Sequence, residues 1–383
     1  MPAADATTGT LAALEAREVE LLRGLVAIPS LSKQERPAVD YLCGAMARLG
    51  FATTIDGAGN AVGTIGAGPR EIVLLGHIDT VPGMIPVRIE DGILHGRGAV
   101  DAKGPLATFV CAAARAIGAG LDGVKLTVIG ATDEEGDSAG GYYVADKYRP
   151  DFALIGEPSG WDSVVLGYRG SMAATYSLRQ AGAHSGAPIA TAPQVAVDFW
   201  NRVMRHAEAF NASRAAAFDR LEPKLRAFNT RTDGLYEQVD LRLGFRLPLD
   251  LDAGALGQLL DEFARIAPAG DDDELAVEAS ATVAIGEALP AFRSDKNSAL
   301  VRAFLPAIRA EGAKPRLKVK TGTADMNIVG PAWGCPIVAY GPGDSKLDHT
   351  PHERTALADY LRAIRVLTAA LLTLGQASEQ TTR

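Results

Sequence analysis

Cysteine is scarce in this sequence. Only Cys43, Cys111 and Cys335 occur among 383 residues, and they lie far apart along the chain. So few scattered thiols exclude both a disulfide framework and a thiolate metal site. Any metal ion must therefore be held by histidine, aspartate and glutamate.

An excess of basic residues and a long apolar run are also missing. The formal net charge of −8 argues against a general nucleic-acid-binding protein, which needs a basic face. The most apolar C-terminal run, residues 366–374, is too short to span a bilayer. Residues 1–9 lack the basic and apolar segments of a signal peptide. We therefore expect a cytoplasmic protein that binds neither nucleic acid nor a membrane.

What remains is the composition of an ordinary globular protein, long enough for two domains. Over the first part of the chain, helical periodicity alternates with short apolar runs. Helices are expected at residues 11–28, 37–49, 106–117 and 139–148, and strands at 51–55, 61–65, 72–75, 126–130 and 152–155. This alternation indicates an α/β fold with a mostly parallel sheet, whose ligands gather at the carboxyl ends of the strands.

His77 and Asp79 stand just after the apolar run at residues 72–75. Side chains at positions i and i+2 point to the same side of a strand. The imidazole can therefore bind a metal ion while the carboxylate orients the ring. The alternative for so short a pattern is a strand end with a loop histidine and a turn aspartate.

Four more turns carry acidic residues or a histidine. Asp101 lies in a glycine-rich turn before a helix, where a helix N-cap is the alternative. Glu134 and Glu135 end an acidic triplet directly after a strand, and a solvated acidic loop is the alternative. Glu157 ends the next strand, and His349 precedes the C-terminal helix.

Together these residues indicate a site for two divalent metal ions. Adjacent carboxylates repel one another unless a cation compensates their charge. Two histidines and three carboxylates can hold a pair of ions with one carboxylate bridging them. One glutamate then remains as a general base for water.

The order of these motifs resembles that of the co-catalytic zinc amidohydrolases of the M20 metallopeptidase family. The motifs are His-x-Asp, Gly-Arg-Gly-x-x-Asp-x-Lys-Gly, Asp-Glu-Glu-Gly, Gly-Glu-Pro-Ser and a late histidine. The resemblance covers the chain from about residue 10 onward. It implies two ligand sets that share a bridging Asp101: His77, Asp101 and Glu157 for one ion, and Asp101, Glu135 and His349 for the other. The ions are expected to be Zn²⁺, although Co²⁺ and Mn²⁺ also suit nitrogen and oxygen ligands.

The same resemblance implies a role for the remaining groups of the site. Glu134 would be the general base, and Asp79 would hold the His77 ring. The peptide bond between Asp101 and Ala102 would be cis. A catalytically silent binding protein with this fold is the non-enzyme alternative, and the complete ligand set together with Glu134 argues against it.

Finer motifs narrow the resemblance. Four motifs are most similar to those of the amino-group carrier protein–lysine or –ornithine hydrolases. They are Gly-Ala-Val-Asp-Ala-Lys-Gly-Pro-Leu, Gly-Glu-Pro-Ser-Gly-Trp, Thr-Gly-Thr-Ala-Asp-Met-Asn and Leu-Asp-His-Thr-Pro. In that group the scissile amide joins the α-amino group of lysine or ornithine to the γ-carboxyl of a glutamate ending a small acidic carrier protein. The resemblance implies a place in lysine or arginine biosynthesis. Acetylornithine deacetylase, succinyl-diaminopimelate desuccinylase and an M20 dipeptidase or carboxypeptidase are the alternatives.

The middle of the chain predicts an inserted domain. Strands at residues 171–178, 239–247 and 275–285 alternate with helices at 193–206 and 253–266. We therefore expect a catalytic domain in two parts, 1–169 and 289–383, around an insert at 170–288. The resemblance implies that this α+β, ferredoxin-like insert is a lid and dimerisation domain of a homodimer. His184 matches a position that stabilises the oxyanion in the partner's active site; the alternative is a polar loop residue.

Candidate substrate contacts also come from the resemblance. Arg246 matches an arginine that grips a substrate carboxylate, and Thr321, Gly322 and Thr323 match a loop that donates hydrogen bonds beside it. Asp325 could meet the side-chain amine of lysine or ornithine.

Two basic segments stand out in this acidic chain. If residues 315–319 form a strand, the alternating Lys314, Arg316, Lys318 and Lys320 share one face. Residues 200–246 carry eight arginines and one lysine against six acidic residues. Either segment could dock an acidic carrier protein, and a solvated surface is the alternative.

Overall fold

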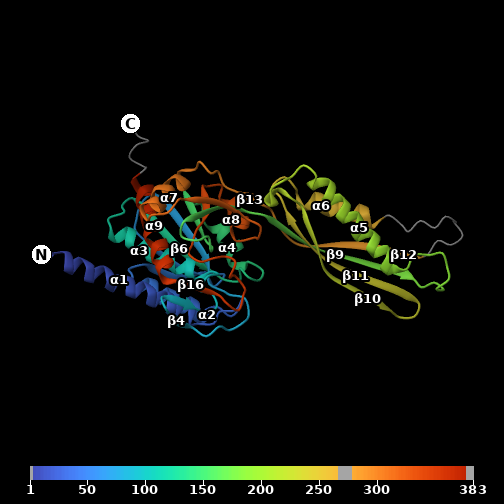
Figure 1. Cartoon of the computed structure of the whole chain (residues 1–383), viewed down its shortest axis with the longest axis horizontal. Coiled ribbons are helices and arrows are strands. Elements are labelled where there is room, and N and C mark those ends of the chain that lie inside the picture. Colours follow the sequence, from blue (N-terminus) through green and yellow to red (C-terminus); the bar gives the residue numbers. More distant parts are fainter. Residues whose placement is uncertain (1–2, 266–277, 377–383) are drawn as a thin grey trace. The chain divides into compact units, whose positions relative to one another are not determined.

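A computed structural model describes residues 3–265 and 278–376. The chain divides into two compact units (Figure 1). The first contains Met1–Gly167, Ser294–Val319 and Ala324–Arg383, and the second contains Tyr168–Arg293 and Lys320–Thr323. From the sequence, the insert was expected at residues 170–288.

A large mixed sheet forms the centre of the first unit, as the alternating pattern predicts. The order of its strands is β1-β2-β6-β3-β7-β15-β8, and β14 pairs with β8. Its strands are β1 (Ala52–Ile55), β2 (Ala61–Ile65), β3 (Arg70–His77), β6 (Val124–Ala131), β7 (Phe152–Gly156), β8 (Ser163–Tyr168), β14 (Arg316–Lys320) and β15 (Ile337–Ala339). The pairs β6–β3, β3–β7 and β7–β15 are parallel, and the outer pairs β1–β2, β2–β6 and β15–β8 are antiparallel.

Helices cover the central strands. They are α1 (Ala3–Val26), α2 (Arg36–Arg48), α3 (Lys103–Gly118), α4 (Ala139–Lys147), α7 (Ala299–Ala310), α8 (Met326–Trp333) and α9 (Leu357–Gln376). The helix α3 packs against both α9 and β3, and α4 packs against α8 (Figure 1). Residues 72–75 of β3 are completely buried, because strands covered on both faces consist of continuous apolar runs.

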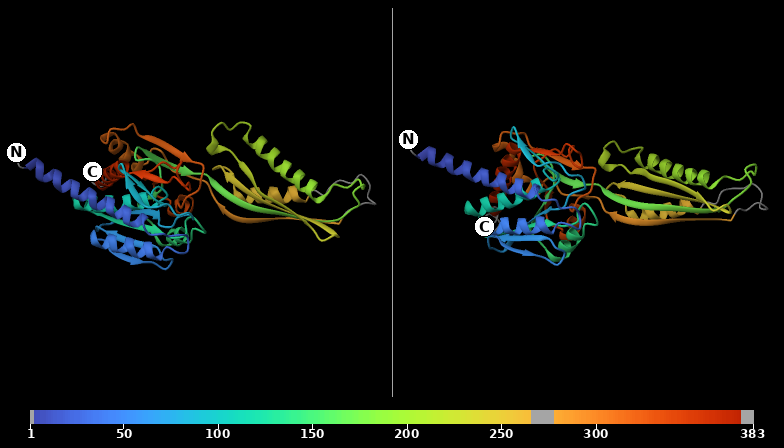
Figure 2. Two further views of the ribbon diagram at one scale, coloured as in Figure 1. Left: turned by 60° about the horizontal axis from the view of Figure 1, so that its bottom comes forward. Right: turned by 90° about the horizontal axis from the view of Figure 1, so that it is seen from below.

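The second unit is a four-stranded antiparallel sheet with two helices on one face. Its elements follow the order β9 (Gly170–Ala181), α5 (Ala192–Asn211), β10 (Glu222–Thr232), β11 (Tyr236–Leu247), α6 (Ala253–Ala264) and β12 (Ala279–Leu289), with a 3-10 turn at Ala217–Asp219 and a short strand β13 (Phe292–Arg293). The spatial order β10-β11-β9-β12 is that of a ferredoxin-like sheet. Figure 2 shows the two helices and the four strands from two further directions.

The prediction for this unit omitted one strand. The expected three strands are present as β9, β11 and β12, but β10 joins them as an edge strand. Most of its side chains are exposed, so it has no alternation of buried and exposed residues that the sequence could reveal. The expected strand 275–285 begins at Ala279 in the structure, and its first residues, like residue 266 of the expected helix, lie outside the described residues.

Several elements of the first unit were also not predicted. The strands β4 (Arg88–Glu90), β5 (Ile93–His95) and β16 (Arg354–Ala356) are too short to show periodicity. The helices α7 and α8 each contain an interior proline, a residue that normally argues against a helix. No helix in the described part of the chain has the length and apolar character needed to cross a membrane.

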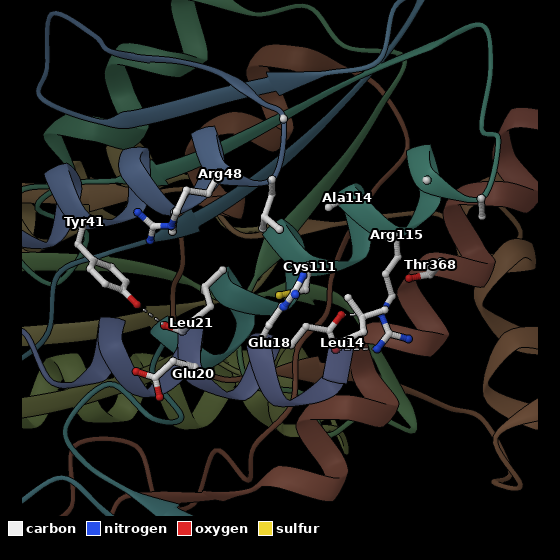
Figure 3. A pocket seen from close by; sticks show the side chains of 16 residues that line it. Leu14, Glu18, Glu20, Leu21, Tyr41, Arg48, Cys111, Ala114, Arg115 and Thr368 are labelled. Carbon is white, nitrogen blue, oxygen red and sulfur yellow. Dashed lines mark hydrogen bonds and ion pairs between the residues drawn. The ribbon is translucent and has the colours of Figure 1, made fainter. Parts of the chain in front are cut away.

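A cavity of about 1070 Å³ lies among α1, α2 and α3 (Figure 3). Apolar residues such as Leu14 and Leu21 line it, and the Arg115 guanidinium pairs with Glu18 at its wall, with Nε 2.5 Å from Oε1. None of the residues that the sequence identifies as site candidates lines this cavity. The candidate chemistry therefore lies elsewhere in the first unit.

Candidate active site

Three neighbouring parallel strands deliver candidate residues to one edge of the large sheet. His77 is the last residue of β3 and pairs in register with Ala131, the last residue of β6. Gly76 pairs with Gly156 at the end of β7. The residues after β6 and β7 therefore start at the level of His77, and they carry Glu134, Glu135 and Glu157. This is the edge at which parallel sheets bind their ligands.

Asp79 is completely buried and ties two of these strand ends together. Its Oδ1 accepts a hydrogen bond from the backbone N–H of Glu134 at 3.1 Å, and its Oδ2 accepts one from Glu135 N–H at 3.0 Å. The Ser32 hydroxyl donates to Oδ2 at 2.8 Å. The His77 Nδ1 atom lies 3.3 Å from Oδ1 and 3.1 Å from the Asp79 carbonyl oxygen. The ring is thus fixed through Nδ1, which leaves Nε2 for a metal ion.

Asp101 reaches the same edge from the loop before α3. Gly98 in this loop has φ +86, where a Cβ would lie 2.9 Å from the Lys103 side chain, so a glycine is needed there. The buried Lys103 Nζ donates to the backbone oxygens of Leu25 and Ile28 and anchors the start of α3. The peptide bond between Asp101 and Ala102 is cis, which confirms the expectation from the sequence.

His349 completes the cluster from a distant part of the sequence. Its Nε2 lies 3.0 Å from Asp101 Oδ2 and 2.9 Å from Glu135 Oε1. Its backbone adopts φ +59, and Asp133, just before Glu134, adopts φ +64. Such left-handed conformations are uncommon outside glycine and concentrate at functional sites, where they aim side chains in otherwise inaccessible directions.

The buried carboxylate of Glu353 holds the His349 segment against the Asp101 loop. Its Oε1 accepts hydrogen bonds from the backbone N–H groups of Val100 at 3.0 Å and Asp101 at 3.1 Å. Its Oε2 accepts one from Arg97 Nη1 at 2.7 Å. The small sheet β16-β5-β4 strengthens the same junction, because β16 follows Glu353 and pairs with β5. The sequence reasoning gave Glu353 no role, although it lies only four residues after His349.

The candidate ligand atoms converge on two neighbouring points. Among the described residues, three groups have ligand atoms within 4.8 Å of one another: His77 with Asp101 and Glu157, His77 with Glu134 and Glu135, and Asp101 with Glu135 and His349. The first and third groups are the two ligand sets expected from the sequence, with Asp101 in both. His77 Nε2 faces Asp101 Oδ1 at 3.3 Å, Glu157 Oε1 at 3.8 Å and Glu134 Oε2 at 4.0 Å.

The electrostatics of the cluster reflect its excess of carboxylates. Burial and the neighbouring Glu157, Asp325 and Glu135 raise the pKa of Glu134 well above its ordinary value, although His77 opposes the shift. Hydrogen bonds that His349 donates to the carboxylates of Asp101 and Glu135 raise its pKa to about 10. Burial alone would raise the pKa of Asp79, but hydrogen bonds and the charge of His77 outweigh it and lower the pKa.

Asp325 adds a further buried carboxyl group to this neighbourhood. It is 3% exposed, and its Oδ1 has no hydrogen-bond partner among the described residues. Burial, followed by the charge of Asp79, raises its pKa to about 7. So many acidic groups around two histidines are unfavourable without a cation. The donors are nitrogen and oxygen atoms only, a set that suits divalent ions such as Zn²⁺, so the residues present fit a two-metal site.

The remaining candidates belong to the second unit. Arg246 is half-buried on β11, and Thr321, Gly322 and Thr323 follow β14. His184 is exposed in the loop after β9, where its Nδ1 accepts a hydrogen bond from the Gly186 N–H at 3.1 Å.

Comparison with known proteins agrees with this geometry. Residues 73–373 match the model of peptidase family M20/M25/M40. The chain is 42% identical over 360 residues to LysW-lysine hydrolase of Deinococcus radiodurans, covering 93% of this chain and 96% of that protein. It is 28% identical over 313 residues to LysW-lysine/LysW-ornithine hydrolase of Saccharolobus islandicus, covering 81% of this chain and 83% of that protein.

Solved structures share the fold. The aminopeptidase PepT of Bacillus cereus superposes with a TM-score of 0.76 at 19% identity, covering 94% of this chain and 98% of that one. The M20 metallo-carboxypeptidase of Sulfolobus solfataricus superposes with a TM-score of 0.73 at 16% identity, covering 94% of this chain and 99% of that one. The chain belongs to the M20/M25/M40 peptidase family and is a metal-dependent hydrolase.

Glu353 provides a test of the junction between the His349 and Asp101 segments. Replacing Glu353 by Gln removes the charge that holds Arg97 and two backbone N–H groups, so Asp101 and His349 should be less well positioned. We expect metal affinity, measured by competition with a chelator, to fall by about tenfold or more, as for other groups that orient metal ligands. Glu90→Gln, in an exposed pair with Arg88 on β4, is the matched control. Unchanged affinity in a folded Glu353→Gln protein would contradict this role.

Proposed function

We propose that this protein hydrolyses the amide that joins lysine or ornithine to the γ-carboxyl of the last glutamate of an amino-group carrier protein, in lysine or arginine biosynthesis. The observation that carries the proposal is the cluster with its two ligand sets and Glu134, in a chain 42% identical to a LysW-lysine hydrolase. The proposal includes a cytoplasmic homodimer.

In this proposal, His77, Asp101 and Glu157 hold one divalent ion, and Asp101, Glu135 and His349 hold the other. When bound, the ions polarise the amide carbonyl and make water a stronger acid. Glu134 takes a proton from the attacking water and returns it to the leaving α-amino nitrogen. Asp79 keeps the His77 ring in one orientation throughout.

The second unit contributes substrate contacts in the same proposal. Arg246 binds the carboxylate of the amino acid that leaves, in a bidentate pair. Thr321, Gly322 and Thr323 donate hydrogen bonds beside it. His184 stabilises the oxyanion in the active site of the partner subunit. An assay with carrier-linked lysine, carrier-linked ornithine, N-acetylornithine and N-succinyl-diaminopimelate tests the choice of substrate, and activity confined to the last two compounds would contradict the proposal.

Glu134 and Glu135 are expected to differ in what they contribute. Glu134→Gln should retain both metal ions and lose about 10²–10⁴-fold in kcat, because the general base is absent. Glu135→Gln should instead lose one ion, because a carboxamide is a weaker ligand than a carboxylate. Metal content by elemental analysis, together with kcat, separates the two effects. Near-normal turnover by metal-loaded Glu134→Gln would mean that the roles are misassigned.

The predicted basic strand face is only partly available for a carrier. Arg316 pairs with Asp162, with Nη2 2.7 Å from each carboxylate oxygen, and the Lys318 Nζ donates to the Ser159 carbonyl at 2.7 Å. Both line a cavity of about 550 Å³ together with the exposed Lys346 and Arg354. These last two charges support docking of an acidic partner at this cavity.

We expect that raising the salt concentration from about 0.05 to about 0.5 M increases the KM for a carrier-linked substrate by several-fold, because exposed charges are screened. The KM for a small acylated amino acid should change far less. Lys346→Glu should raise the KM for the carrier-linked substrate alone, whereas Lys296→Glu, also exposed but outside the cavity, should not. Equal salt sensitivity of both substrates would exclude docking by charge.

The proposed role of His184 in the partner's site predicts complementation between inactive subunits. His184→Ala should bind metal and dimerise but lose about 10²–10³-fold in kcat for want of an oxyanion donor. Glu134→Ala should be inactive for a different reason. Mixing the two under conditions of subunit exchange gives dimers in which one site has both residues, so about a quarter of wild-type activity should return. If exchange occurs and no activity returns, His184 does not serve the partner's site.

A further inference from the structure

The open face of the sheet in the second unit carries a row of arginines. The helices α5 and α6 pack on the opposite face, over the buried residues of β9 and β11. On the open face, alternate residues of β11 place Arg242, Gly244 and Arg246 in line. Arg226 projects to the same face from the neighbouring strand β10, and all four residues line a cavity of about 580 Å³.

Small residues make room for this row. A Cβ at Gly244 would lie 3.1 Å from Arg226 Nε, so the glycine leaves room for the Arg226 side chain over β11, between Arg242 and Arg246. On the other side of β11, the residues opposite this row in register are Ser171, Ala173 and Thr175. Small side chains therefore line one part of the cavity, and guanidinium groups line another.

The charges of these arginines are only partly balanced by acidic residues at the cavity, Glu222 and Glu287. Arg226, Arg242 and Arg246 form no ion pair with any residue that the structure describes. Of the two acidic residues at the cavity, Glu222 already pairs with the buried Arg169 at 3.0 Å and with Lys224 at 3.5 Å. Burial, followed by the nearby Arg169 and Arg226, lowers the pKa of Arg246. An excess of guanidinium groups over carboxylates at one cavity indicates a site for an anionic ligand.

The row of Arg242, Arg226 and Arg246 is longer than the binding site for one carboxylate needs to be. Strand residues advance about 3.3 Å each, so the backbone positions of Arg242 and Arg246 are about 13 Å apart, with Arg226 between them. A single carboxylate accepts one bidentate arginine pair, which Arg246 alone supplies. The row can therefore bind two carboxylates that are separated by several bonds.

The proposed substrate has these two groups. A glutamate linked through its γ-carboxyl keeps its own α-carboxylate free, and the lysine or ornithine keeps another. We propose that Arg226 and Arg242 form a second carboxylate subsite that binds the free α-carboxylate of the γ-linked glutamyl residue, an inference that rests on the proposed function. This subsite would distinguish γ-glutamyl substrates from acetylated ones, which lack the second carboxylate.

Two matched substrates test this subsite directly. One is Nα-(N-acetyl-γ-glutamyl)-lysine, and the other is the same molecule with the glutamyl α-carboxylate converted to a carboxamide. In the wild type, the carboxamide should have a KM on the order of tenfold or more higher, because a charge-assisted hydrogen-bond pair is lost. Arg226→Ala and Arg242→Ala should raise the KM for the carboxylate substrate by a similar factor and should no longer distinguish the two substrates. Their kcat values should change little, since the reacting groups are untouched.

Arg231→Ala is the control variant. Like Arg226→Ala, it removes one guanidinium from β10. Arg231, however, pairs with Asp240 and does not line the cavity. This variant should discriminate between the two substrates as the wild type does. The double variant Arg226→Ala/Arg242→Ala measures whether the two arginines act on one group, in which case its effect is smaller than the product of the single effects.

The possible outcomes separate this inference from the proposed function. If the wild type hydrolyses the γ-glutamyl substrate but treats the carboxamide equally well, the subsite is excluded and the function stands. Equal losses on both substrates in Arg226→Ala and Arg242→Ala would likewise exclude it and would indicate a structural effect. If the wild type hydrolyses neither these compounds nor a carrier-linked substrate, the proposed function fails and the subsite assignment fails with it.

Discussion

The arrangement of the site depends on the buried carboxylate of Asp79. This group accepts two backbone hydrogen bonds from the turn that carries Glu134 and Glu135, and it also faces the His77 ring. It therefore fixes the candidate base, one candidate ligand carboxylate and one candidate ligand imidazole relative to one another. The Ser32 hydroxyl satisfies part of its remaining capacity. Removing one partner from such a buried charged network commonly costs about 3–5 kcal/mol, because the charge left behind has no solvent.

The rest of the site comes from two different kinds of scaffold. His77, the acidic turn and Glu157 follow parallel strands whose register sets them level with one another. Asp101 and His349 have no strand of the large sheet beneath them. They are held instead by the Glu353 carboxylate and by the short β16–β5 pairing, which join two segments far apart in sequence. These contacts position Asp101 and His349, whereas strand register positions the other site residues.

The parts of the fold that the sequence predicted are those with strong local patterns. The apolar run of β3 and the alternation in β9 have a definite period because burial acts on every residue, or on every second residue, of each strand. The edge strand β10 is largely exposed on both sides, so its sequence carries no such period. The two helices with interior prolines contradict local propensity, and packing against α9 and α4 compensates in α7 and α8 respectively.

The sequence by itself determined that residues able to bind metal or accept a proton, His77, Glu134, Glu135 and Glu157, lie at or just after the ends of successive strands. Residue type and strand periodicity can both be detected within short segments of the sequence. Only the tertiary structure brought Asp101 to both His77 and His349, identified Glu353 as the link between their loops, and placed Arg226 over Gly244 beside Arg242 and Arg246. These relations depend on strand register and on a β-bulge in β10, which arise from pairing between distant segments and leave no signal in either segment alone.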